Sequence, residues 1–481
     1  MSRGLSLAPH SYSTRRALRA GSVWLALTGA SACNGSRAPF SVEIVDATGA
    51  DPVAGAGSGR LRVLVAQDGQ PTRDQGVDLV AGSFTLDVTI ASYVLPTRLG
   101  VELVRDGVTS IGAVPSFAAI GFPFVRVPVL PRGTCAVVGT QRLATPRAGA
   151  ALVSADAIAL VVGGLDGSSS PAATGERFTP QLLTSGRGSI PSLTSTLAVG
   201  RARAARLAAT DDVHVLASGR SFFLDLTSGV GAPSDAALHD GAGERSALVA
   251  LAGNGLAVVG GSQGAAGAPA VSWVALDRTL SQSTLPVARR DATASAWGNA
   301  EGVLVAGGNA LGASTFLFVP AAAAQREDVE AFGPEAEPTR ALAGGALVRS
   351  PDGTAALYVG ALDDRGEVTD ETFVVTGCPS RCAVSPGPRW PRPRTRFAFA
   401  QTATAGWIVG GRDEEGPVSD VDRVTWSGST PSFTASALAA PREDASVAPF
   451  AGGLVLVVGG RDGERAREDF ELCAPEALDT I

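Results

Sequence analysis

The chain has 481 residues, a formal net charge of −7 and a pI of about 5.2, and all 39 of its basic residues are Arg. An acidic chain is poorly suited to neutralising phosphates, which argues against a nucleic-acid partner. Aromatic residues make up 5% of the chain, few for a protein that binds sugars or single strands by stacking.

Residues 1–32 have the pattern of a signal peptide for export. A basic segment precedes a short apolar run, Val23–Leu27, and a small-residue stretch ends just before Cys33. This pattern resembles a bacterial lipoprotein signal, which would make Cys33 the lipidated first residue, although Ala30 stands where that family usually has Leu. Two alternatives stay open: ordinary cleavage after Ala32, and the twin-arginine route, whose signal Thr14-Arg15-Arg16 approaches but the following Ala17-Leu18-Arg19 fits poorly.

A short tether, 33–38, leads to a predicted β-domain at 39–131. Alternation of apolar and polar residues predicts half-buried antiparallel strands, and a domain of this size suits an immunoglobulin-like or transthyretin-like β-sandwich. The expected strands are Ser41–Val45, Arg60–Ala66, Ser83–Ile90, Leu99–Arg105 and Phe124–Leu130. Asp68-Gly69 and Asp106-Gly107 are predicted hairpin turns, and Pro128, Pro131 and Gly133 a stiff linker.

The rest of the chain is an internal repeat. The stretch Pro146–Gly164 predicts a hairpin whose second strand ends at a glycine pair, and similar ends recur every 42 to 55 residues. The intact pairs are Gly163-Gly164, Gly260-Gly261, Gly307-Gly308, Gly410-Gly411 and Gly459-Gly460. Two further units carry the degraded pairs Ser218-Gly219 and Val359-Gly360. An Arg precedes every pair, at Arg147, Arg201, Arg245, Arg289, Arg340, Arg394 and Arg442.

These glycine pairs resemble those of the kelch repeat family, in which a diglycine closes the second strand of a four-stranded propeller blade. The resemblance covers about residues 136–476 and implies an all-β protein: a seven-bladed kelch-like β-propeller at 135–476 preceded by the small sandwich. The last unit is about one strand short, and Leu143–Arg147 matches Leu438–Arg442 in spacing. We therefore expect residues 136–145 to supply the outer strand of blade seven, which leaves no open edge at the seam.

Four cysteines remain if Cys33 is lipidated, and an even number in an exported protein suggests disulfides. Cys135 and Cys473 fall at the two ends of blade seven, and Cys378 and Cys382 flank a loop between strands of blade five. We expect the pairs Cys135–Cys473 and Cys378–Cys382. A single Cys-x3-Cys without a nearby His is insufficient for a zinc site, so no metal is expected.

Catalytic candidates are scarce in the sequence. Only three His occur, and we expect His214, inside a predicted strand, to be structural. Copper-oxidase chemistry on a kelch fold needs two Tyr and two His at the ring centre, but Tyr358 alone would lie in the propeller. Acidic loops follow the glycine pairs, for example at Asp166-Gly167, and they fit solvated turns better than a Ca²⁺ site, because they lack its alternating carboxylates. No cofactor is expected.

The seven repeat arginines could surround one rim of the ring and bind an anion, or serve a structural role within and between blades, which their recurrence favours. The sequence thus predicts a monomeric, non-catalytic scaffold of the cell envelope that recognises a protein or glycan. It would be anchored by lipid, in the outer membrane, or else be secreted or periplasmic. The alternative is a periplasmic sugar-modifying enzyme resembling kelch-fold mutarotases of acidic sugars.

Overall fold

The structure, a computed structural model, describes the greater part of the chain in segments. The described residues are 22–25, 38–39, 41–47, 58–79, 88–92, 94–117, 124–155, 158–172, 175–178, 192–193, 201–206, 212–217, 220–225, 231–233, 238–243, 245–251, 255–263, 266–275, 280–298, 302–308, 315–321, 329–332, 342–363 and 365–479. Within them the protein is built almost wholly of strands; one short 3-10 turn, η3 (Ala451–Gly453), interrupts sheet structure near the C-terminus. No helix in these segments is long and apolar enough to cross a bilayer.

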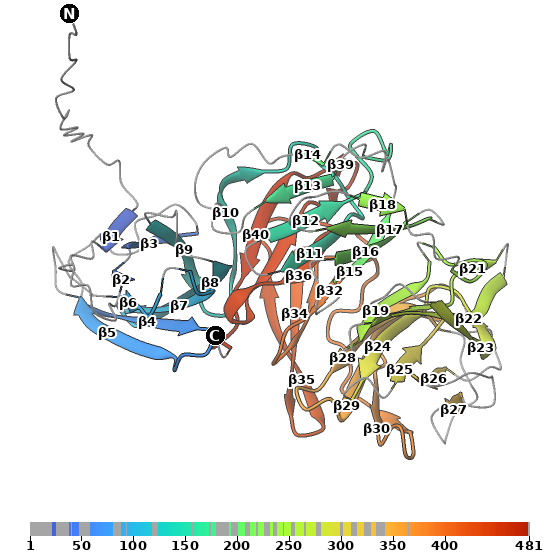
Figure 1. The fold of residues 1–481 in the computed structure, drawn as a ribbon. Coiled ribbons are helices and arrows are strands. Elements are labelled where there is room, and N and C mark those ends of the chain that lie inside the picture. Colours follow the sequence, from blue (N-terminus) through green and yellow to red (C-terminus); the bar gives the residue numbers. More distant parts are fainter. Residues whose placement is uncertain are drawn as a thin grey trace, which may run out of the picture.

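The N-terminal strands form one curled sheet of seven strands in the order β1-β3-β9-β8-β7-β4-β5 (Figure 1). Its strands are β1 (Ser22–Leu25), β3 (Ser41–Asp46), β4 (Gly59–Gln67), β5 (Arg73–Leu79), β7 (Thr97–Arg105), β8 (Val108–Phe117) and β9 (Phe124–Pro131). A separate two-stranded sheet pairs β2 (Ala38–Pro39) with β6 (Thr89–Ile90). Alternate residues such as Leu61, Val63 and Val101 fill a common core, so one face of the curled sheet is apolar, as period-2 patterning requires.

This sheet differs from the expected domain in three ways. The strands β5 and β8 were not predicted, because the charged edge strand β5 and the continuous apolar run of β8 both lack clean alternation. Strand β3 pairs with β9 in parallel, whereas an antiparallel arrangement was expected. Pro128 and Pro131 lie within β9 and not in a linker. The β8–β9 register joins Ile111 to Leu130, near the end of β9, and an extended strand accommodates proline there.

Seven meandering sheets follow in the described part of residues 135–473, and we number them in chain order. Sheet 1 comprises β11 (Ala151–Ala155), β12 (Ile158–Val162), β13 (Gly175–Phe178) and β14 (Ser192–Leu193). Sheet 2 comprises β15 (Ala202–Arg206), β16 (Asp212–Ala217), β17 (Arg220–Asp225) and β18 (Gly231–Pro233). Sheet 3 comprises β19 (Ala247–Leu251), β20 (Gly255–Val259), β22 (Ala266–Val274) and β23 (Leu280–Arg289), with β21 (Ser262–Gln263) paired to β22.

Sheets 4 to 6 repeat the four-strand meander. Sheet 4 comprises β24 (Thr293–Trp297), β25 (Gly302–Ala306), β26 (Phe316–Pro320) and β27 (Glu330–Phe332). Sheet 5 comprises β28 (Ala343–Arg349), β29 (Ala355–Leu362), β30 (Phe373–Thr376) and β31 (Ala383–Pro386). Sheet 6 comprises β32 (Ala398–Gln401), β33 (Gly406–Val409), β34 (Asp420–Ser427) and β35 (Thr430–Ala437). In each sheet a strand pairs antiparallel with the next one in the chain, so local hairpins build the whole unit.

Sheet 7 combines two distant parts of the chain. Its order is β10-β40-β37-β36, in which β36 (Ser446–Pro449), β37 (Val455–Val458) and β40 (Asp469–Cys473) come from the C-terminus and β10 (Cys135–Arg142) comes from the start of the repeat region. A small ribbon of β38 (Arg461–Asp462) and β39 (Arg465–Ala466) extends from it. The antiparallel register sets Cys135 opposite Cys473, and β10 covers what would otherwise be an open edge of β40.

The seven sheets pack face to face in a closed series. The first strands of successive sheets, β11, β15, β19, β24, β28, β32 and β36, each lie against the next, and β36 lies against β11. A separate apolar cluster fills each interface between neighbouring sheets, and the cluster between sheets 7 and 1 also takes in Ile111 and Leu130 of the N-terminal domain. This arrangement is consistent with a β-propeller (Figure 1).

Candidate ligand-binding site

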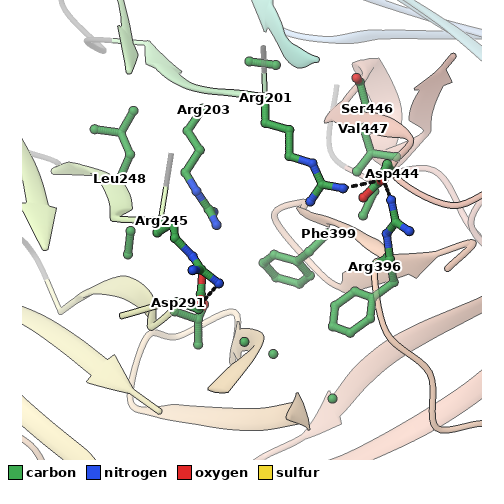
Figure 2. A pocket seen from close by; sticks show the side chains of 18 of the residues that line it. Arg201, Arg203, Arg245, Leu248, Asp291, Arg396, Phe399, Asp444, Ser446 and Val447 are labelled. Carbon is green, nitrogen blue, oxygen red and sulfur yellow. Dashed lines mark hydrogen bonds and ion pairs between the residues drawn. The ribbon is translucent and has the colours of Figure 1, made fainter. Parts of the chain in front are cut away.

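The first strands of all seven sheets surround a pocket of about 750 Å³. Small side chains such as Ala150, Ala202 and Ala247 line its wall, so the strands leave open space along the common axis. Figure 2 shows Arg201, Arg203 and Arg245 projecting into this space, with Phe399 of sheet 6 beside them. The volume falls in the range usual for small-molecule sites.

At or close to the start of each first strand, one residue lies at the mouth of the pocket. We call these seven residues the rim residues. They are Gly149, Arg201, Arg245, Asp291, Gly344, Arg396 and Asp444. Backbone hydrogen bonds join neighbouring sheets at this level. The Asp444 amide donates to the Arg396 carbonyl at 2.9 Å, and the Gly149 amide donates to the Asp444 carbonyl at 2.7 Å. The Gly344 amide likewise donates to the Asp291 carbonyl at 2.6 Å.

Three rim residues hold a backbone conformation that suits glycine. The φ angles of Asp291, Arg396 and Asp444 are 58°, 53° and 51°, close to the 68° of Gly149 and the 74° of Gly344. A side chain in this left-handed region costs about 1 kcal/mol relative to the usual conformation. Glycine occupies this position in sheets 1 and 5, which shows that the position accepts it. Sheets 4, 6 and 7 have a charged residue there in spite of the backbone strain, and such strain is concentrated at functional sites.

The rim side chains form ion pairs across the pocket mouth. Arg201 Nη2 lies 2.8 Å from Asp444 Oδ2, and Arg396 also bonds that carboxylate (Figure 2). On the far side, Arg245 Nη2 lies 2.7 Å from Asp291 Oδ2. Burial opposes the charge of Arg396, but the hydrogen bond with Asp444 and the nearby Glu443 outweigh it and raise the pKa of Arg396 above its usual value. This guanidinium therefore stays charged at any physiological pH.

The charge balance of the pocket is positive. Four guanidinium groups line it, those of Arg201, Arg203, Arg245 and Arg396, against the two carboxylates of Asp291 and Asp444. The pocket lining thus has more positive than negative groups, although the formal net charge of the whole protein is −7. A concave site walled by protein concentrates the field of the charged groups that line it.

The six repeat arginines that the structure describes occupy two different positions. Arg147, Arg289, Arg394 and Arg442 are almost fully buried inside their sheets. Arg201 and Arg245 are rim residues, two positions further along the unit, where the side chain faces the pocket. Sequence spacing could not separate the two, because both positions lie just before the first strand. The seventh, Arg340, lies outside the described residues.

The buried arginines explain why Arg and the glycine pair recur together. Arg147 donates to the carbonyl of Gly163 at 3.2 Å, and Arg442 donates to that of Gly459 at 3.0 Å. The same contact joins Arg394 to Gly410 at 2.6 Å and Arg289 to Gly307 at 2.8 Å. The first glycine of each of these pairs has a φ between 58° and 67°, a conformation that directs its carbonyl toward the guanidinium.

Carboxylates on the third strands complete three of these buried sites. Glu176 bonds Arg147 at 2.5 Å, and Asp422 bonds Arg394 at 2.6 Å. Arg442 bonds both Glu471 and Asp469. Each pair satisfies a buried charge and ties the loop before a sheet to its third strand. These four arginines are therefore structural.

In sheet 3 a histidine replaces the buried arginine. His239 Nε2 lies 2.8 Å from the Gly260 carbonyl oxygen, and its Nδ1 lies 2.8 Å from Ser272 Oγ on the third strand. The other described histidine, His214, is buried in β16 against Phe223, with ring centroids 4.8 Å apart. Burial lowers the pKa of His214 to about 4, so it is neutral at physiological pH.

Two disulfides join cysteines in the described part of the chain. Cys135–Cys473 has a sequence separation of 338 and closes sheet 7, and Cys378–Cys382 has a separation of 4 and lies in the turn between β30 and β31. Cys33, the residue expected to carry lipid, lies outside the described residues.

The acidic loops fold on themselves. The carboxylates of Asp166, Asp363 and Asp413 each accept hydrogen bonds from backbone amides two to four residues further on. Among the described residues no group of three or more His, Cys, Asp or Glu side chains is placed to hold a metal ion.

Comparison with known proteins leaves the family open. No protein-family model matches the sequence. No curated protein matches it either. Among solved structures the chain is similar to one titled "Structure of YjhT", with 12% identity, a TM-score of 0.41, and coverage of 68% of this chain and 95% of that one.

Proposed function

We propose that this protein is a non-catalytic binding scaffold of the cell envelope, in which residues 135–476 form a seven-bladed kelch-like propeller that recognises a protein or glycan ligand. The N-terminal β-domain, 39–131, would hold the propeller away from the membrane. The ligand would enter the central pocket, where the first strands of all seven sheets converge.

The observation that carries this proposal is the backbone strain of the rim. Asp291, Arg396 and Asp444 place charged side chains at the pocket mouth from a conformation that glycine would adopt without cost. The ion pairs of these side chains join different sheets, and charged groups at the pocket mouth also give direction and specificity to recognition, because charge-assisted hydrogen bonds are directional.

A glycan and peptidoglycan array probed with the mature protein tests the proposal. Wild type should bind a restricted set of compounds, and the rim variant Arg396→Gln should lose that binding. Arg98→Gln is the matched control, because Arg98 is an exposed arginine of the N-terminal domain whose ion pair with Asp68 is solvated. Equal binding by all three proteins would place recognition away from the pocket and contradict the proposal.

The second candidate is a sugar-modifying enzyme acting on acidic sugars. The pairing of guanidinium and carboxylate groups inside one pocket favours it, since such groups could orient an acidic sugar and shuttle a proton. A direct assay would follow mutarotation of acidic sugar anomers by NMR. Turnover that disappears in Arg201→Gln would replace the binding proposal with this one.

The proposed location is the cell envelope, with residues 1–32 removed and Cys33 lipidated as the first residue of the mature protein. Two disulfides support an oxidising compartment. Strand β1 lies inside the proposed signal, so processing would remove it from the edge of β3. Expressed in a Gram-negative host, the protein should incorporate labelled palmitate and Cys33→Ser should not. An unlabelled, soluble wild type would leave ordinary secretion as the route.

A further inference from the structure

The rim residues suggest which chemical group the pocket recognises. Arg201, Arg203 and Arg245 project into it from two neighbouring sheets (Figure 2). The side chains of Arg201 and Arg245 remain 47% and 39% exposed, so both can reach a ligand in the pocket. Guanidinium groups bind carboxylate and phosphate through paired hydrogen bonds, which a neutral hydroxyl does not reproduce.

Arg201 is also held by a carboxylate of the protein itself. Its guanidinium extends past Gly149 of sheet 1 and reaches Asp444 of sheet 7, at 2.8 Å. Asp444 is 92% withdrawn from solvent, since only 8% of its side chain is exposed, and it also binds Arg396. Asp444 thus satisfies Arg201 from inside the rim, at the place where an entering anion would bind it.

We infer that the central pocket is an anion site regulated by an internal carboxylate. The ligand carries a carboxylate or phosphate group that binds Arg201, Arg203 and Arg245, and it competes with Asp444 for Arg201. Two observations support competition. The Arg201 side of the Arg201–Asp444 pair is 47% exposed, so solvent screens the pair and a ligand in the pocket can reach the guanidinium. Arg396 remains paired to Asp444 and Glu443 after Arg201 leaves, so Asp444 is not left as an unpaired buried charge.

This inference rests on the proposed function, and it predicts opposite effects for two rim variants. Removing a guanidinium removes a charge-assisted hydrogen bond, so Arg203→Gln should weaken anion binding about tenfold. Removing the competing charge should do the reverse: Asp444→Asn should strengthen anion binding, by up to about fivefold if the lost pair is worth about 1 kcal/mol. A purely structural role for Asp444 would give weaker binding in both variants.

Isothermal titration of the mature protein at low ionic strength tests the inference, with malonate and inorganic phosphate as probes and glycerol as the neutral control. Arg98→Gln controls for the loss of one positive charge elsewhere, and thermal unfolding checks that each variant is folded. We expect binding of at least one probe, and tighter binding of malonate or of phosphate tells a carboxylate ligand from a phosphate ligand.

Two results would overturn the inference. One is an affinity of Asp444→Asn at or below that of wild type, in a folded protein. The other is failure of both anions to bind while a neutral glycan binds the pocket, which would leave the proposed function in place. If the protein binds neither anion and no compound of the glycan and peptidoglycan array, both the inference and the proposed function are contradicted.

Discussion

Arg201 of sheet 2 lies over Gly149 of sheet 1 and donates a hydrogen bond to Asp444 of sheet 7 at 2.8 Å, so a single side chain spans three sheets. A Cβ at position 149 would come within 3.0 Å of Arg201 Cγ. A side chain at position 149 would therefore crowd the path that Arg201 takes across the rim.

Gly149→Ala should displace Arg201 as well as strain the backbone. Its φ of 68° penalises alanine by about 1 kcal/mol, and the Cβ contact adds to that penalty. Gly353→Ala is the matched control, because its φ is 72° and a Cβ there would meet nothing within 4 Å. Both should melt earlier than wild type, and only Gly149→Ala should change malonate binding. Unchanged binding in a folded Gly149→Ala protein would show that Arg201 needs no path over sheet 1.

The buried arginines should matter far more to stability than exposed ones. Arg442 bonds Glu471 and Asp469 inside sheet 7, and Arg442→Met leaves those carboxylates without it, at a cost of about 3–5 kcal/mol in the free energy of unfolding. Arg389→Met removes an exposed pair with Asp370 and should cost about 0–1 kcal/mol. Denaturant unfolding measures both, and similar losses in the two variants would refute the structural role given to Arg442.

Stability should depend on pH through His214. Its pKa is lowered to about 4 by burial, so the unfolded chain binds its proton more tightly than the folded one. The contribution of His214 is fully present above about pH 6.5 and is lost as the pH falls toward 4, by up to about 3 kcal/mol. His214 Nε2 forms a hydrogen bond with Ser221 Oγ, and the amide of His214→Gln can take its place, so this variant should flatten the stability curve between these pH values. A curve as steep as that of wild type would exclude His214 as the titrating group.

The two disulfides should stabilise unequally. Cys135–Cys473 closes a loop of 338 residues and Cys378–Cys382 a loop of 4. In the chain-entropy description the longer loop is worth about 5 kcal/mol and the shorter one much less. Replacing both cysteines of the long loop by Ser should therefore lower the melting temperature more than replacing both of the short one. Non-reducing peptide mapping checks the pairing first, and any peptide joining Cys135 to Cys378 would contradict the assembly of sheet 7.

The sequence indicated the repeated sheets because an arginine and an apolar strand recur in each unit and five of the seven units also carry an intact glycine pair. The structure gives the reason, since in sheets such as 6 the arginine bonds the carbonyl of the first glycine. The degraded pair Val359-Gly360 lies inside the long strand β29, where Gly360 keeps a positive φ of 80°. The arginine and glycine positions that define each sheet could therefore be predicted from the sequence.

Only part of the candidate site could be predicted from the sequence. Asp291, Arg396 and Asp444 were not singled out, because nothing in a sequence marks a charged residue that adopts a left-handed conformation. Their common signal is position, two residues after the buried arginines Arg289, Arg394 and Arg442. Arg203 could not be predicted to face the pocket either, since that depends on which face of a first strand turns to the axis.

The most direct test of the account is a crystal structure of the mature protein soaked in selenate, with the anion located by its anomalous scattering. The account predicts selenate in the central pocket, bonded to Arg201, Arg203 and Arg245, with the Arg201–Asp444 hydrogen bond broken, and no selenate there in crystals of Arg203→Gln. A well-ordered pocket without selenate, in crystals that bind it elsewhere, would contradict the assignment of this pocket as an anion site.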